Sequence, residues 1–145
     1  MPYMRDAWLA MKGVMRLARQ IINEKLEPMN LSGAEGDLLF LLLTGSNSLR
    51  QEELGAQLDV GKAAVSRAVD SLEKKGYVVR MRKKNDRRAC SISLTDEALS
   101  VGDKIVEIYN MFYSSATKDI TEGDMKQLIF LLSRVAANLR MLGET

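Results

Sequence analysis

Two short helical patterns, separated by only three residues, constrain the fold of this chain more than any other feature. The first pattern covers residues 51–58 and the second covers 62–75. This spacing predicts a helix-turn-helix. In the second helix, apolar residues recur at positions i, i+3, i+4 and i+7, so one side faces the core. The exposed positions left on its first two turns are Lys62, Ala63, Ser66 and Arg67.

An alternating, basic segment follows the second helix. Gly76 is a typical helix stop, and 77–83 and 88–94 then alternate on either side of turn residues. The pattern predicts a two-stranded hairpin, which is a wing when it is attached to a helix-turn-helix. In the first strand Val78, Arg80 and Arg82 share one face. In the second strand Cys90 alternates with Ile92 and Leu94, which predicts a small, buried thiol.

Positive charge is concentrated in this part of the chain. Residues 61–90 hold ten basic and three acidic side chains, a net charge of +7, whereas the whole chain carries only +2. The remainder is therefore acidic. Such an asymmetry is typical of a protein with one face that binds nucleic acid.

Longer helical patterns flank this core. Apolar residues recur every three or four positions from 8 to 26, and again in the two helices expected after Thr95 and Thr121, while Ser32 with Glu35 predicts a capping box before a buried helix. The expected fold is mainly α with a small β-hairpin wing. Its parts are an N-terminal dimerisation helix (1–30), a winged helix-turn-helix (31–95) and C-terminal dimerisation helices (96–145), integrated into one domain.

The composition argues against several classes of protein. The chain has no histidine and only one cysteine, which excludes an internal disulfide and argues against a zinc site or a histidine-based triad. It also lacks a clustered acid pair and a glycine-rich phosphate loop, so we expect no enzyme, no cofactor and no metal. No apolar run approaches the roughly 20 residues that cross a bilayer, and no signal peptide is recognisable. We expect a cytoplasmic protein.

Together these features resemble the MarR family of winged helix-turn-helix regulators. The resemblance lies in the segment 49–78, in the wing motif formed by Asp86 and Arg88 with Leu94 and Thr95 after it, and in the long flanking helices. It implies a homodimer that binds a pseudo-palindromic operator with one recognition helix per half-site. It also implies release from DNA by a small molecule or by cysteine oxidation. The first helix has no cysteine near its start, which argues against oxidant sensing.

The candidate DNA contacts fall into two groups. Arg67 is suited to pair bidentately with guanine, and Lys62 is suited to a phosphate, although a solvated helix face remains the alternative for both, as for Ser66. The resemblance places Arg88 in the minor groove with Asp86 holding its side chain. The alternative there is a polar turn with an incidental ion pair. The other candidates at the wing are Arg82 and Arg87, and for Arg80, Arg82, Lys83 and Lys84 phosphate contact and a solvated strand face are both open.

The function predicted from these observations is sequence-specific binding of double-stranded DNA. The expected protein is a homodimeric repressor relieved by a small aromatic or lipophilic effector. The alternatives are a transcriptional activator of the same fold and a winged-helix module that binds protein.

Overall fold

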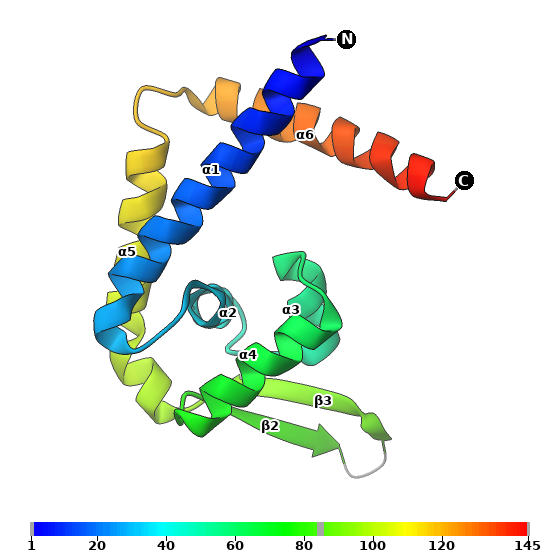
Figure 1. Ribbon diagram of the computed structural model, residues 1–145. Coiled ribbons are helices and arrows are strands. Elements are labelled where there is room, and N and C mark those ends of the chain that lie inside the picture. The colour runs from blue at the N-terminus through cyan, green and yellow to red at the C-terminus, as the bar shows by residue number, and fades with distance from the viewer. Residues whose placement is uncertain (1, 84–85, 145) are drawn as a thin grey trace. The chain divides into compact units, whose positions relative to one another are not determined.

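The structure is a computed structural model that describes residues 2–83 and 86–144, without the side chains of 83–89. The chain forms two compact units, Met1–Met111 and Phe112–Thr145. The elements are α1 (Pro2–Leu26), η1 (Glu27–Met29), α2 (Gly33–Thr44), β1 (Ser48–Arg50), α3 (Gln51–Leu58), α4 (Lys62–Lys74), β2 (Val78–Lys83), β3 (Asp86–Leu94), α5 (Asp96–Ala116) and α6 (Glu122–Gly143) (Figure 1). This order confirms the predicted fold class.

Helix α2 is the buried centre of the first unit. It begins with the predicted capping box: the Ser32 hydroxyl accepts a hydrogen bond from the Glu35 amide at 3.2 Å, and the Glu35 carboxylate accepts one from the Ser32 amide at 3.1 Å. Leu38, Leu39 and Leu42 are then buried almost completely. A helix that is apolar on all sides needs neighbours on all sides, which α1, α4 and the wing sheet supply.

The predicted helix-turn-helix is formed by α3 and α4. Asp59 ends α3 in the left-handed conformation, with φ at 53°, and Gly61 is the N-cap of α4. Val65, Val69 and Leu72 are the buried residues of α4, as the periodicity predicts. Gly76, at φ 81°, reverses the chain after the helix.

The wing is a three-stranded antiparallel sheet with strand order β1-β3-β2. In the predicted hairpin, Val78 pairs with Leu94 and Arg80 with Ile92. The sequence pattern does not predict the additional strand, β1, in which Ser48–Arg50 pairs with β3. A strand of three residues is too short for an alternating pattern to stand out, and only its pairing with a distant segment reveals it.

Within the first unit, side chains of α5 pack against those of α2. The Thr95 hydroxyl caps α5 by accepting a hydrogen bond from the Ala98 amide at 3.2 Å. A Cβ atom added to Gly102 would lie 2.7 Å from the side chain of Leu43, so the glycine permits a close approach of the two helices. Further along, Tyr109 is buried and its ring stacks on that of Phe40, at 4.5 Å between centroids.

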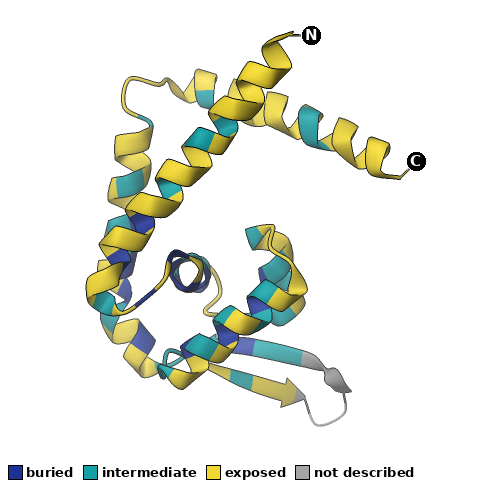
Figure 2. Cartoon of the chain, viewed as in Figure 1, coloured by how far each residue is buried: buried dark blue, intermediate teal, exposed yellow. Residues whose placement is uncertain are grey.

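The second unit contains the end of α5 and all of α6. Thr121 caps α6 by accepting a hydrogen bond from the Asp124 amide at 3.0 Å, which confirms the helix start that the sequence predicts. None of the described residues of α6 is buried, and the N-terminal half of α1 in the first unit is also largely exposed (Figure 2).

Candidate nucleic-acid interface

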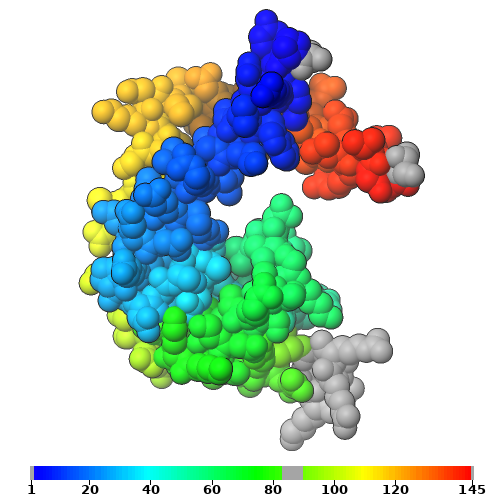
Figure 3. Space-filling model, in the orientation of Figure 1, coloured from blue at the N-terminus to red at the C-terminus, as the bar shows by residue number. Residues whose placement is uncertain are grey.

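Helix α4 presents the residues predicted to contact DNA. Lys62, Ala63 and Arg67 are exposed, whereas Ser66 is half-buried. Its N-cap, Gly61, provides no side-chain hydrogen bond. The surface of α4 lies on the same face of the first unit as α3 and β2, in green (Figure 3). These four side chains occupy the first turns of a helix whose opposite side is fixed in the core, which is the arrangement required to read a major groove.

The far end of α4 is tied to α2 by a buried ion pair. The Lys75 ammonium lies 2.9 Å from one carboxylate oxygen of Glu35 and donates a hydrogen bond to the Asn30 carbonyl at 2.7 Å. The Ser71 hydroxyl donates to the same carboxylate at 3.0 Å. These contacts join residues that are about 40 positions apart in the chain, so they fix the position of α4 against α2.

The ionised form of Glu35 is stabilised although its side chain is only 8% exposed. Burial by itself raises the pKa of this carboxyl group. Hydrogen bonds from Lys75, from the amide and hydroxyl of Ser32 and from the Ser71 hydroxyl outweigh burial, so the net pKa of Glu35 lies below its ordinary value. The carboxylate therefore remains charged at neutral pH and can hold Lys75.

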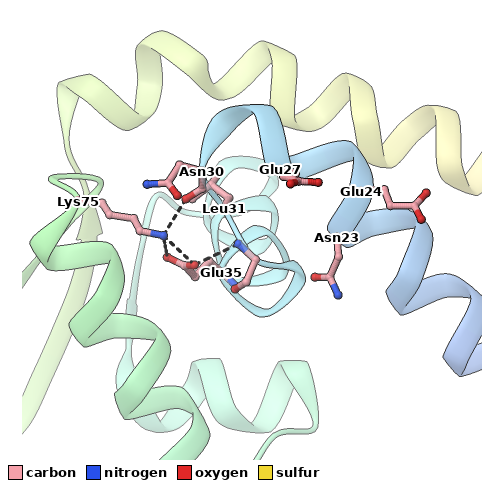
Figure 4. A pocket seen from close by; sticks show the side chains of 8 residues that line it. Asn23, Glu24, Glu27, Asn30, Leu31, Glu35 and Lys75 are labelled. Atoms are coloured by element: carbon pink, nitrogen blue, oxygen red, sulfur yellow. Dashed lines mark hydrogen bonds and ion pairs between the residues drawn. The ribbon is translucent and has the colours of Figure 1, made fainter.

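The same ion pair forms one wall of a polar hollow of about 560 Å³ at the end of α1 (Figure 4). Asn23, Glu24 and Glu27 line the other side of this hollow. Figure 4 shows Lys75 and Glu35 pointing toward each other. The charged groups in that wall thus bind one another.

A second set of polar contacts links α1, α2 and α5. Asp37 on α2 accepts hydrogen bonds from the Tyr109 hydroxyl at 2.6 Å and from the Arg19 guanidinium at 3.0 Å. Asp37 therefore connects α2 to α1 and α5, and Glu35 connects α2 to the end of α4.

Arg80 faces α4, which corrects part of the sequence interpretation. Its guanidinium lies 2.6 Å from Asp70 and 3.2 Å from Glu73, and its side chain is only 18% exposed. Of the two alternatives that the sequence leaves open, the solvated strand face is wrong for this residue, whereas phosphate contact stays a prediction. The strand places Arg80 beside α4, where two carboxylates neutralise it.

The remaining wing candidates are less fully described. The side chain of Arg82 is exposed on β2. The backbone of Asp86, Arg87 and Arg88 forms the start of β3. Their side chains, like those of Lys83 and Lys84, lie outside the described residues, so the predicted contact between Asp86 and Arg88 stays a prediction.

Cys90 lies on the same face of β3 as Ile92, as predicted, but it is half-buried instead of buried. It lines a groove of about 870 Å³ between α3, the start of α4 and the wing, together with Lys62 and Arg82. Ile92 is completely buried, whereas Cys90 is two residues farther toward the hairpin tip, where it pairs with Arg82.

Among the residues whose side chains the structure describes (2–82 and 90–144), no group of three or more histidine, cysteine, aspartate or glutamate residues is placed to hold a metal ion. Across that same part of the chain, none of the helices is both apolar enough and long enough to span a bilayer.

Comparison with known proteins identifies the fold and the family. The family model described as "MarR family" matches residues 31–90. An HTH-type transcriptional regulator of Bacillus cereus is 31% identical over 129 residues, which cover 88% of this chain and 85% of the relative. This chain belongs to the MarR family. It is thus a DNA-binding, winged helix-turn-helix transcriptional regulator and not an enzyme.

Solved structures share its fold. AbsC, a MarR family regulator from Streptomyces coelicolor, superposes with a TM-score of 0.80 at 22% identity and covers 94% of this chain and 93% of its own. A mutant MarR from E. coli complexed with operator DNA gives 0.72 at 24% identity, covering 87% and 90%. The organohalide-sensing regulator RdhR in its 2,4-dichlorophenol-bound form gives 0.79 at 19% identity, covering 94% and 80%.

Proposed function

We propose that this MarR family regulator is a homodimeric repressor that binds a pseudo-palindromic operator and is released by a small aromatic or lipophilic effector. The observation that carries the proposal is the exposed front of α4. Lys62 and Arg67 are solvent-exposed there, while Val65 and Val69 anchor the helix in the core. Arg67 reads a guanine edge and Lys62 binds a phosphate. Arg88 at the wing enters the minor groove.

A homodimer is supported by apolar side chains that one copy of the chain leaves in solvent. Long helices of a soluble protein normally bury such faces, and a second copy provides the cover that the single chain lacks. The exposed residues on α1 include Tyr3, Trp8, Leu9, Val14, Met15 and Leu17, and those on α6 include Leu128, Ile129, Phe130, Leu131, Leu139 and Leu142. Two copies also supply two recognition helices, one per half-site.

Gel-shift titration with the DNA upstream of the chain's own gene tests the DNA-binding part, with a random duplex of equal length as the reference. Each lost phosphate contact lowers the salt slope of log K by about one. Lys62→Ala should show this drop. Lys74→Ala is the matched control, because Lys74 is an equally exposed lysine at the other end of α4. Equal slopes for both variants would remove Lys62 from the interface.

The dimer is tested by sedimentation at the concentrations used for DNA binding. A monomer that binds a full operator as a single copy would contradict the proposal. The alternative function, a module that binds protein, would be favoured if no duplex bound more tightly than random DNA. An activator is distinguished from a repressor by transcription in vitro from the promoter that carries the operator.

The effector class is supported by the RdhR relative, whose structure holds 2,4-dichlorophenol. A thermal-shift screen of aromatic acids, phenols and cationic lipophiles should find compounds that raise the melting temperature, because a ligand of the folded state stabilises it. A compound that counts as an effector must also weaken operator binding. Compounds that stabilise the protein without releasing DNA would contradict the proposed mode of relief.

A further inference from the structure

Arg80 joins the wing to the recognition helix through three residues of α4. Its guanidinium contacts the carboxylates of Asp70 and Glu73, and it donates a hydrogen bond to the Ser66 carbonyl at 3.3 Å. The Arg80 amide donates a further hydrogen bond to Glu73 at 3.3 Å. Residues 66, 70 and 73 lie at i, i+4 and i+7, so they form one stripe along the helix. One side chain from β2 therefore spans two turns of α4.

The position of this stripe matters for DNA binding. With 3.6 residues per turn, the stripe falls between Lys62 and Arg67 around the helix, and Ser66 belongs to both the stripe and the proposed DNA contacts. Asp70 comes one turn after Ser66, with its side chain 56% exposed. An unpaired carboxylate at this point would repel the phosphates. Arg80 neutralises it.

The other face of β2 gives no comparable link. Val79 and Met81 are exposed, whereas Val78 and Arg80 face inward and pair with Leu94 and Ile92. Val78 is an apolar contact that tolerates small rotations. The forked guanidinium binds two carboxylates and a carbonyl of α4, so it fixes the orientation of β2 as well as its distance from the helix.

We propose that Arg80 is a positioning residue for operator binding: it fixes the wing relative to the recognition helix and offsets part of the negative charge of Asp70 and Glu73, without touching DNA itself. This inference rests on the proposed function, in which the wing and α4 enter adjacent grooves. It assigns Arg80 a role opposite to that of Arg82, an exposed arginine two residues along the same strand.

The first test needs no DNA. Hydrogen exchange of free Arg80→Met is compared with wild type and with Arg82→Met. We expect amides of β2 and β3 to exchange about tenfold faster in Arg80→Met only, because the charged hydrogen bonds to α4 are lost. Unchanged exchange in the wing would overturn the proposal, whatever the protein binds.

The second test measures operator affinity and its salt dependence. Arg80→Met should bind the operator about tenfold more weakly, with the salt slope of wild type, since no phosphate contact is lost. Arg82→Met should lower the slope by about one. Arg80→Lys keeps the charge but not the fork, so its affinity should lie between Arg80→Met and wild type. A slope reduced in Arg80→Met would show direct phosphate contact and overturn the proposal.

A third variant is expected to tighten DNA binding instead of weakening it, and it also tests the proposal if Arg80→Met fails to fold. Asp70→Asn combined with Glu73→Gln keeps Arg80 but removes both acids. By charge alone, this change tightens binding to every duplex. The positioning role predicts a smaller ratio of operator affinity to random-duplex affinity. An unchanged ratio, with both affinities raised alike, would overturn it. If wild type shows no preference for the operator, the proposed function fails, and the exchange experiment still decides the role of Arg80.

Discussion

Replacing Lys75 by methionine tests how firmly α4 is held against α2. The change removes the ammonium that binds Glu35 at 2.9 Å and the Asn30 carbonyl at 2.7 Å, while the methylene stem is retained. Removing one partner of a fully buried ion pair costs about 3 to 5 kcal/mol. Since Lys75 is 27% exposed, water screens part of the interaction, and we place the loss near the lower limit, about 3 kcal/mol at pH 7.

The pH dependence of this loss has a definite sign. The pKa of Glu35 is lowered in the folded protein, so the stability it contributes is present above the pKa of the unfolded chain and is lost as pH falls through the folded value. Burial raises the pKa of Glu35, and the hydrogen bond from Lys75 is the largest contribution that lowers it. Lys75→Met removes this hydrogen bond, so Glu35 is protonated at a higher pH in the variant than in wild type. The difference between wild type and variant should therefore shrink as pH falls below about 4.5, near the ordinary pKa of a glutamate.

Urea unfolding followed by circular dichroism measures both effects at a fixed protein concentration, because the stability of the proposed dimer depends on concentration. Glu35→Gln and the double variant complete a double-mutant cycle. A loss below about 1 kcal/mol at pH 7 would refute the reasoning, because it would place the pair among ordinary surface ion pairs. A loss that stays constant between pH 7 and pH 4 would refute the assignment of the effect to the ionised carboxylate.

Two further changes address local structure. Ser32→Ala removes the side-chain half of the capping box and should lower the free energy of unfolding by about 1 kcal/mol in the same urea assay. A change below roughly 0.3 kcal/mol, the scatter of such measurements, would show that the Ser32 hydroxyl is dispensable. Gly76→Ala places a Cβ at φ 81° and 2.9 Å from the Glu97 carboxylate, so the melting temperature should fall by several degrees, corresponding to about 1 kcal/mol or more; an equal or higher melting temperature would contradict the strain at this turn.

Local signals in the sequence were sufficient for the helices and their ends. The apolar spacing in 62–75 identified the buried side of α4, and Ser32 with Glu35 identified the start of α2, because both signals involve neighbours within two turns. The three-residue strand β1 lacks such a signal. It is stabilised by pairing with residues 91–93, more than 40 positions later.

In the candidate site too, local features could be predicted from the sequence, whereas long-range contacts could not. Exposure of Lys62 and Arg67 follows from helical periodicity, whereas the partners of a charge depend on which segments the fold brings together. Nothing local indicates that Arg80 meets Asp70, or that Lys75 meets a glutamate 40 residues earlier. The net charge of residues 61–90 therefore overstates the positive charge available to DNA, since Lys75 and Arg80 are paired with carboxylates of the protein itself.

The order of strands in the wing also affects how copies of the protein meet. β3 is central, with β1 beside its second half, so β2 and the short β1 are the edges of the sheet. An open edge is a template for pairing with another chain, and charged side chains discourage such pairing. β2 carries Arg80, Arg82 and Lys83 along its length. The exposed Arg82 thus protects the edge from aggregation, and a variant that removes its charge will become prone to strand-to-strand association at high concentration.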